Sequence, residues 1–408
     1  ADDKVKRETI NKLIDYMNKK FPNYKNNKYI NTLSKNRKII YKLINIKMYI
    51  LYWHTLKNVL KYWILKSRSK NVQHFLLSSK ARSLNIMNIV KMSDMEAFEM
   101  FKSIRWNETN GDVVCPCCGS LEKPYFLKTR MQFRCKECFY TFSVTSGTIF
   151  ANHKLPLQTY LLAIALFTNS VKSISALQLS RDLNVQYKTA WVLSHKIRES
   201  LMDYNSDEKF EGTCEMDGVY VNHYVRPKNN IDDRVDRRKV HKPNKRVVIS
   251  LRQRAEDGDE VVGAVKTKTF VLKSENSIDI KTIAHKYIKV GTSIHTDESN
   301  AYDDLTAHYD MNRVNHQIEY SGIYGENNNQ SESYNARFRR MQYGNLHKIG
   351  NLYLSNYANE IAYREDTRRW NNSKIFTNIL TRCLTSNVSN EFCGYWQGNK
   401  RLSERLGV

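Results

Sequence analysis

The stretch TCEMDGVYV, residues 213–221, decides the fold of the larger part of this 408-residue chain. Its apolar residues surround a single aspartate, Asp217, as expected of a strand that carries a polar side chain into a site. Two more strand-like stretches follow, RVVISLRQR at 246–254 and EVVGAVKTKTF at 260–270, with turn residues between them. Three successive stretches of this kind predict the first strands of a β-sheet.

The sequence beyond residue 276 alternates between helical and strand periodicity. It predicts a helix at 277–288, a strand at 291–298, a helix at 300–309 and a strand at 313–320. Three strands followed by alternating helices and strands are typical of a mixed α/β sheet. The polar segment 205–212 predicts a linker before the sheet, and the residues from Gln330 onwards predict helices.

The chain is strongly basic, with 65 Lys and Arg against 41 Asp and Glu and a net charge of +24. An excess of this size favours a polyanionic partner such as nucleic acid. Residues 1–90 contain 20 of the basic and 4 of the acidic residues, so two thirds of the net charge lies there. Because this segment is rich in Lys, Asn and Ile, it is either a DNA-binding arm or a compositionally biased extension.

Within that extension, residues 39–65 are apolar and aromatic but interrupted by lysines. The lysines favour an amphipathic basic helix or a helical hairpin over a membrane span. The first ten residues do not resemble a secretory signal. We therefore expect no membrane partner and a place in the cytoplasm, at the nucleoid of a bacterium, or in the nucleus of a eukaryote. Without export, the eight cysteines are expected to be reduced or metal-bound.

Four cysteines have the spacing of zinc ligands. They are Cys115, Cys118, Cys135 and Cys138, in the pattern C-x2-C-x16-C-x2-C. Each pair spans one tight turn, and a hairpin between the pairs can close four sulfurs around one zinc ion. Such a shell has no open position, so we expect a role in folding and DNA contact. Two disulfides or free core thiols are the alternative, and Cys117 is a competing ligand.

The segment 173–201, SISALQLSRDLNVQYKTAWVLSHKIRESL, is similar to a helix-turn-helix. It predicts a helix over 175–182, a turn over 183–185 and a second helix from Gln186, with an Asn suited to the turn. The residues expected to face the core are Ala190, Trp191, Leu193 and Ile197. The residues expected to meet phosphates and base edges are Gln186, Lys188, Thr189 and His195. A helical hairpin without DNA contacts is the alternative.

Three carboxylates occur in unlike settings: Asp217 and Asp297 in strand-like stretches, and Glu332 at the start of an arginine-rich helical segment. Carboxylates from two strands and a helix can hold two magnesium ions about 4 Å apart, as phosphodiester chemistry requires. Arg339 lies seven positions after Glu332, two helical turns on, and is expected beside bound phosphates. Turn aspartates and a surface glutamate are the alternative.

Taken in order, these motifs resemble insertion-sequence transposases that join a zinc ribbon to a DDE domain, a group related to the Merlin elements. The resemblance covers about residues 93–373. Its motifs lie at 104–119, 133–150, 175–191, 215–221, 225–229, 233–238, 295–305, 327–349 and 359–369. One departure is that Asn222 and His223 stand where glycines often follow the first aspartate's strand.

The resemblance implies a multidomain α+β protein with a ribonuclease-H-like mixed α/β catalytic domain. The expected parts are a basic, helical extension at 1–90, a zinc ribbon at 91–150, a helix-turn-helix-like segment at 151–204, the catalytic domain at 213–345 and a helical tail at 346–408. Asp217, Asp297 and Glu332 are then the catalytic, metal-binding triad. Asn329 and His347 are implied as neighbours of the site, and Arg337, Arg339 and Arg340 as DNA contacts.

The implied activity is DNA transposition with a structural zinc and two catalytic magnesium ions, or manganese. The implied partners are double-stranded DNA, as terminal inverted repeats and target, and at least one further copy of the chain in a synaptic complex. One alternative is a domesticated or inactive transposase that acts as a zinc-ribbon DNA-binding regulator. Another is a different nuclease, such as a resolvase of branched DNA.

Overall fold

The computed structural model describes residues 75–202, 208–222, 224, 226–236, 240, 242–256, 263–313 and 327–407. The chain divides into two units, Ala1–His74 and Phe75–Val408, and all described residues belong to the second. The amphipathic helix predicted at 39–65 lies outside the described residues, as does most of the strand predicted at 313–320. Among the described helices, none has the length and apolar character to cross a bilayer.

The described elements form a small cysteine-rich sheet, a helical region and a larger sheet. The helices are α3 Ile86–Val90, α4 Asp94–Arg105, α5 Leu157–Asn169, α6 Ala176–Asp182, α7 Tyr187–Ser200, α8 Ser277–Tyr287, α9 Asn329–Met341, α10 Leu354–Asp366 and α11 Asn372–Thr385. The strands are β1 Tyr125–Leu127, β2 Gln132–Arg134, β3 Thr141–Ser143, β4 Thr213–Val221, β5 Arg246–Arg254, β6 Ala264–Leu272, β7 Ser293–Thr296 and β8 Asp310–Arg313.

The small sheet is an antiparallel arrangement in the order β1-β2-β3. Its strands are short, and aromatic side chains bind it to α4: Phe133 packs against Phe98 and Trp106 at ring distances of 5.7 and 5.8 Å. Helix α4 begins with a capping box in which Ser93 and Glu96 bond each other's backbone N–H. This helix and the small sheet therefore form one folded region around the four cysteines.

The helical region has the two helices and the turn that its sequence predicts. Helix α6 begins after the N-cap Ser175, and α7 begins after Gln186. Asn184 in the turn between them has φ 50°, a left-handed conformation that asparagine tolerates better than most residues. Ala190, Leu193 and Ile197 are buried in the core that α5, α7 and α11 share, as expected, whereas Trp191 is half-buried.

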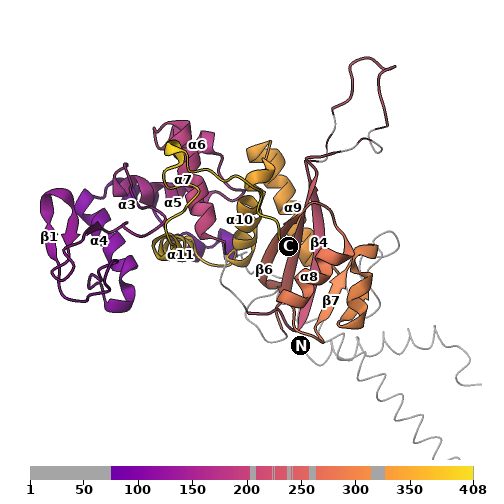
Figure 1. Ribbon diagram of the computed structural model, residues 1–408, viewed down its shortest axis with the longest axis horizontal. Helices are drawn as coiled ribbons and strands as arrows, with labels where there is room; N and C mark the ends of the chain where they lie inside the picture. The colour runs from indigo at the N-terminus through magenta and orange to yellow at the C-terminus, as the bar shows by residue number, and fades with distance from the viewer. Residues whose placement is uncertain are drawn as a thin grey trace, which may run out of the picture. The chain divides into compact units, whose positions relative to one another are not determined.

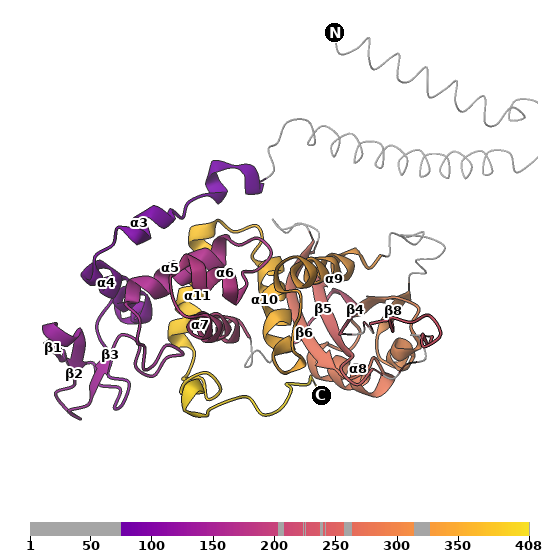
Figure 2. The same cartoon turned by 90° about the horizontal axis from the view of Figure 1, so that it is seen from above.

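The large sheet has the strand order β6-β5-β4-β7-β8. Strands β4, β5 and β6 are antiparallel neighbours, whereas β7 is parallel to β4 and β8 is parallel to β7. The prediction of a mixed α/β sheet is therefore confirmed. Helix α8 covers one face, and α9 and α10 cover the other (Figure 1 and Figure 2).

Three details of this part of the chain differ from prediction. Phe210, in the predicted linker, is fully buried, because its backbone bonds Tyr287 and Lys289 and its ring joins the sheet's core. The helix predicted at 300–309 is the 3-10 helix Asn300–Ala307. The predicted helical tail ends with α11, and beyond it only the 3-10 turn Tyr395–Gln397 is helical among the described residues. Left-handed glycines flank that turn.

Candidate functional site

The four cysteines predicted to bind zinc lie together. The Sγ atoms of Cys115 and Cys138 are 3.6 Å apart, and those of Cys118 and Cys135 are 3.7 Å apart. Four sulfurs at the usual zinc–sulfur distance of 2.3 Å stand about 3.8 Å from one another in a tetrahedron. The backbone N–H of Cys138 is the main cause that lowers the pKa of the Cys135 thiol to about 7, which favours the thiolate that zinc requires.

The other cysteines lie outside this cluster. Cys117 is exposed and belongs to no metal-ligating group among the described residues. Cys214 and Cys383 are buried thiols, whereas Cys393 is partly exposed. Gly119 after the first cysteine pair has φ +74°, so the turn there uses the conformational freedom of glycine. The geometry and ligand set fit one structural zinc ion.

The two aspartates of the proposed triad lie on neighbouring parallel strands. Asp217 is in the middle of β4, and Asp297 directly follows β7. The register pairs Glu215 with His295, so two residues further along Asp297 comes level with Asp217. Adjacent strands are about 4.8 Å apart, which brings both carboxylates to one place on the sheet.

Helix α9 carries the third carboxylate over the same strand. Glu332 lies in its first turn, and Asn335 lies almost one turn further on. The Asn335 side-chain Nδ2 donates a hydrogen bond of 2.8 Å to Asp217 Oδ2. This bond sets the distance between α9 and β4 and thereby positions Glu332.

The carboxylates are close enough to affect each other's charge. Burial raises the pKa of Asp217 to about 7, with smaller contributions to this rise from the charges of Asp297, Glu275 and Glu332. The Gly218 backbone N–H, which donates to Asp217 Oδ1 at 2.7 Å, opposes this rise. An uncompensated negative potential of this kind favours a bound cation.

A buried glutamate that the sequence did not single out holds the start of α9. Glu215 Oε2 accepts the backbone N–H groups of Gln330 at 2.7 Å and Ser331 at 2.9 Å, while its Oε1 accepts Arg254 Nε at 2.6 Å. A carboxylate at a helix N-terminus satisfies free N–H groups and the positive end of the helix dipole. Glu215 lies two residues before Asp217, so the strand period places both on the same face of β4. This spacing is the sequence pattern that could have identified Glu215.

A fourth carboxylate, Glu275, also escaped prediction. Its two oxygens accept hydrogen bonds from the hydroxyls of Tyr220 at 2.9 Å and Tyr302 at 2.7 Å. A Cβ on Gly218 would lie 3.2 Å from Glu275 Oε2 and 2.9 Å from Val247, so the glycine makes room here. Nothing local in the sequence distinguishes Glu275, since its role depends on contacts with residues that lie far along the chain.

Buried oxygen atoms beside the carboxylates suit a hydrated cation. Ser331 Oγ and Asn335 Oδ1 are buried, and no residue that the structure describes gives them a hydrogen bond. Carboxylate and amide oxygens are the ligands that magnesium prefers, usually with several waters. Within the described ranges, only the four cysteines are close enough together for three or more side chains to share one ion. Asp217, Asp297 and Glu332 lie too far apart for that in this arrangement.

The other residues predicted around this site lie along α9 and after it. Asn329 is the exposed first residue of α9, and His347 is exposed at φ 56°. Arg339 and Arg340 are exposed, whereas the side chain of Arg337 pairs with Glu365 of α10 and remains 41% exposed. Arg337 thus also anchors α9 to α10.

The predicted DNA-contact residues of α7 divide into two groups. Gln186 and Lys188 are exposed and Thr189 is half-buried, so these three are open to a ligand. The prediction for His195 is wrong, because it is fully buried among aromatic rings, with Trp191 at 4.4 Å and Tyr353 at 4.9 Å. Burial lowers the pKa of His195 well below its usual value, so it stays neutral.

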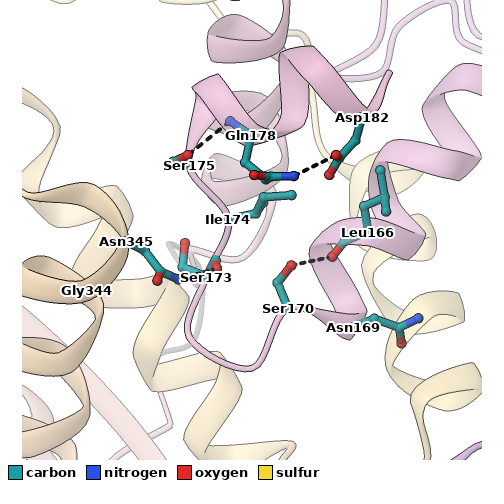
Figure 3. A pocket seen from close by; sticks show the side chains of 10 residues that line it. All are labelled: Leu166, Asn169, Ser170, Ser173, Ile174, Ser175, Gln178, Asp182, Gly344 and Asn345. Atoms are coloured by element: carbon teal, nitrogen blue, oxygen red, sulfur yellow. Dashed lines mark hydrogen bonds between the residues drawn. The ribbon is translucent and has the colours of Figure 1, made fainter. Parts of the chain in front are cut away.

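Several contacts join the helical region to the elements around the carboxylates. Arg198 of α7 and Glu360 of α10 form a buried ion pair of 2.7 Å. Asn345 Nδ2 donates to the backbone carbonyls of Lys172 at 2.6 Å and Ser173 at 2.8 Å. Figure 3 shows Asn345 directed at Ser173 beside a polar hollow in the surface, which helix α6 borders.

Comparison with known proteins shows that both regions are similar to transposase domains. Residues 92–141 match the transposase zinc-ribbon domain, and residues 209–366 match the ISXO2-like transposase domain. The predicted resemblance to insertion-sequence transposases is thereby confirmed, and the zinc-ribbon match supports the structural zinc. Domains of these two kinds imply a protein that acts on DNA.

A relative from an archaeal mobile element agrees with this assignment. The chain is 29% identical over 133 residues to an uncharacterized protein in transposable element ISH50 of Halobacterium salinarum. The aligned part covers 32% of this chain and 42% of that protein. The chain therefore spans less than half the length of this relative.

Proposed function

We propose that this chain, which carries a transposase zinc ribbon and an ISXO2-like transposase domain, is a DNA transposase that cleaves and joins the ends of a mobile element. In this proposal the regions 91–150 and 151–204 bind the terminal inverted repeats. The region 213–345 is a ribonuclease-H-like catalytic domain that cleaves the ends and transfers them to target DNA. Two ends must be paired, so the active form is at least a dimer.

The observation that carries the proposal is the level placement of Asp217 and Asp297 on adjacent parallel strands beneath α9. Three antiparallel strands followed by two parallel ones support the ribonuclease-H-like assignment. Helix α9 presents Glu332 from above, held by the Asn335–Asp217 bond. This arrangement supports the proposal that carboxylates from two strands and a helix form the triad.

The residues of the site divide into metal ligands, positioning residues and a phosphate contact. Asp217, Asp297 and Glu332 bind two divalent cations, magnesium or manganese. Such ions supply an activated attacking oxygen and stabilise the leaving oxygen of a phosphodiester. Asn335 and Glu215 act through the others, because they orient Asp217 and fix α9. Arg339, exposed two turns beyond Glu332, binds substrate phosphate.

Metal-dependent cleavage of a DNA carrying the element's terminal repeats tests the proposal. We expect Asp217→Ala and Glu332→Ala to lose cleavage and strand transfer by at least about 1000-fold, since neither carboxylate has a replacement. Glu298→Ala is the matched control, because Glu298 is exposed next to Asp297. Cleavage by the triad variants at the wild-type rate would contradict the proposal.

The same DNA separates the transposase from its alternatives. Wild-type binding without cleavage or strand transfer, at any magnesium or manganese concentration, would favour the DNA-binding regulator. Cleavage of branched DNA without dependence on the repeats would favour a resolvase-type nuclease. Products joined to a second DNA molecule are expected only of a transposase.

The helix-turn-helix assignment has its own test in the salt dependence of binding. Lys188 is exposed at the start of α7, with its Nζ 4.8 Å from the Trp396 ring. If Lys188 contacts a phosphate, Lys188→Ala reduces the slope of log affinity against log salt by about 1. Gln186→Ala should instead relax the preference for one base pair. If Lys188→Ala leaves the salt slope unchanged and Gln186→Ala leaves the base-pair preference unchanged, α7 does not contact the DNA.

A further inference from the structure

Helix α9 presents an exposed stripe that continues past its formal end. Residues Gln342–Leu346 form a π-helical turn that follows α9 without a break. Glu332, Arg339 and Tyr343 lie seven and then four positions apart, which puts them on one helical face. The opposite face, with Tyr334, Phe338 and Met341, is buried against the sheet.

Tyr343 is the aromatic member of this stripe. Its side chain is 61% exposed, whereas Tyr334 of the same helix is fully buried. The residues from Ser333 to Lys348 include five cationic side chains or histidines and no acidic residue. An exposed ring beside arginines, on the same face as Glu332, suits a strand of nucleic acid that offers both a phosphate and a base.

The backbone that carries Tyr343 is strained and fixed on both sides. His347 has φ 56° and ψ −44°, and Lys348 N donates to Leu346 O at 2.6 Å, which is the rare, strained form of a γ-turn. Strain of this kind persists only where surrounding contacts impose it, and it gathers at functional sites. π-helical turns are also frequent at such sites.

Two asparagines impose that conformation. Asn345, in the π-helical turn, donates to the carbonyls of Lys172 and Ser173. Asn222, at the end of β4, donates to Ile349 O at 2.9 Å and Asn351 Oδ1 at 2.6 Å. Tyr343 is thereby presented to solvent from a segment that is tied to its surroundings before and after the turn at His347.

We infer that Tyr343 stacks on an unpaired base of the DNA strand next to the phosphodiester that the carboxylates cleave. This inference rests on the proposed function and adds to it a local opening of the duplex at the transposon end. Arg339 holds the phosphate, and the ring of Tyr343 replaces the stacking that the opened base loses. Because any base has a π-face, the contact favours opening over sequence recognition.

The inference is tested with paired DNA ends and with ends that carry a mismatch at the first base pair beside the cleaved phosphate. Tyr343→Ala should cleave paired ends roughly 5- to 100-fold more slowly than wild type, the range that one base–aromatic stack supplies. The mismatch should restore most of this loss. Tyr343→Phe and Tyr343→Trp should stay within a few-fold of wild type, since both keep an aromatic ring.

A fluorescent base analogue gives a readout that does not depend on cleavage. With 2-aminopurine beside the scissile phosphate and calcium in place of magnesium, wild type should quench its emission and Tyr343→Ala should not. Ile278→Ala is the matched control, because Ile278 is 76% exposed on α8, across the sheet from α9.

Two results would overturn the inference while leaving the proposed function intact. One is Tyr343→Ala cleaving both kinds of end at the wild-type rate with unchanged 2-aminopurine emission. The other is Tyr343→Ala altering the oligomeric state without DNA, which would assign the ring to a second copy of the chain. Failure of the wild-type chain to cleave any end would instead contradict the proposed function.

Discussion

The zinc site and the proposed magnesium site of this chain are built in opposite ways. The zinc site takes all four ligands from one stretch of 24 residues, and its sulfurs already stand 3.6–3.7 Å apart. The carboxylate site would take its ligands from β4, the end of β7 and α9, and these residues span 116 positions. A closed site can be encoded locally, whereas an open site depends on the whole sheet.

The two sites also differ in what holds them before metal binds. Backbone N–H groups favour the thiolate of Cys135, whereas burial and the neighbouring sulfurs raise the pKa of Cys118 and Cys138. At the other site, burial and neighbouring charges work against the ionised form of Asp217. Glu215, Asn335 and Arg254 maintain that arrangement through hydrogen bonds and an ion pair. We therefore expect zinc to be needed for folding and magnesium for reaction alone.

The largest expected effect is on the closed site. Cys135→Ser should unfold the zinc ribbon, because structural zinc contributes about 10–16 kcal/mol to the folding of such small units. Hydrogen exchange should show lost protection of β1, β2 and β3, with β4, β5 and β6 unchanged. Cys117→Ser is the control and should keep both regions protected, since Cys117 is exposed and lies outside the cluster. Equal loss in both sheets would show that the two regions fold as one.

The next largest effect is on the support of the open site. Glu215→Ala leaves Arg254 and the first N–H groups of α9 without their acceptor. Removal of one partner of a buried pair costs about 3–5 kcal/mol, so denaturant unfolding should register a loss of that size. Cleavage should fall as well, because Glu332 moves with α9.

Glu208 provides the control for Glu215. It pairs with Lys266, but its side chain is 82% exposed. Glu208→Ala should change the free energy of unfolding by less than about 1 kcal/mol. If Glu215→Ala is equally mild, α9 is held by its apolar face alone.

A third effect concerns the charge of Asp217 in the metal-free chain. Its folded pKa of about 7 lies above its ordinary 3.8, so the folded state holds the proton more tightly than the unfolded chain does. The stability that this contributes is present at low pH and is lost as pH rises towards 7. Asp217→Asn removes the dependence, so its advantage over wild type should grow by about 2–3 kcal/mol from pH 5 to pH 8.

Thermal and denaturant unfolding in the presence of a chelator for magnesium, with zinc retained, measures this difference. Added magnesium should stabilise wild type at pH 8 and leave Asp217→Asn almost unchanged. A variant that is less stable than wild type at both pH values would mean that the Asp217 carboxylate holds the fold together. In that case the open site would resemble the closed one.

The sequence predicted local features well. Cysteine spacing, the helix-turn-helix and strands β4 and β5 all depend on neighbours within a few residues, and the structure has them at the predicted positions. Asn222, noted as a departure from glycine, has φ 56°, so it adopts the conformation that glycine would have supplied. Local periodicity and turn chemistry carry this information.

Residues that depend on contacts across the fold were missed. Glu275 and Asn335 have no local signature, since their partners lie 55 and 118 positions away. The error at His195 was avoidable, because it lies four residues after Trp191, which was expected in the core, and so shares its helical face. The prediction that His195 contacts DNA rested on its residue type and left out the helical period that it shares with Trp191.

The smallest expected effect separates a ligand from a neighbour at the open site. Glu275 raises the pKa of Asp217 by charge, and it is itself held by two tyrosine hydroxyls. As a neighbour only, Glu275→Gln lowers the pKa of Asp217, so the pH for half-maximal manganese binding should fall by less than about one unit. Glu298→Gln, on an exposed carboxylate next to Asp297, serves as control. If Glu275→Gln abolishes manganese binding measured by calorimetry, Glu275 is a fourth ligand. The open site would then have as many protein ligands as the zinc site while remaining accessible to substrate.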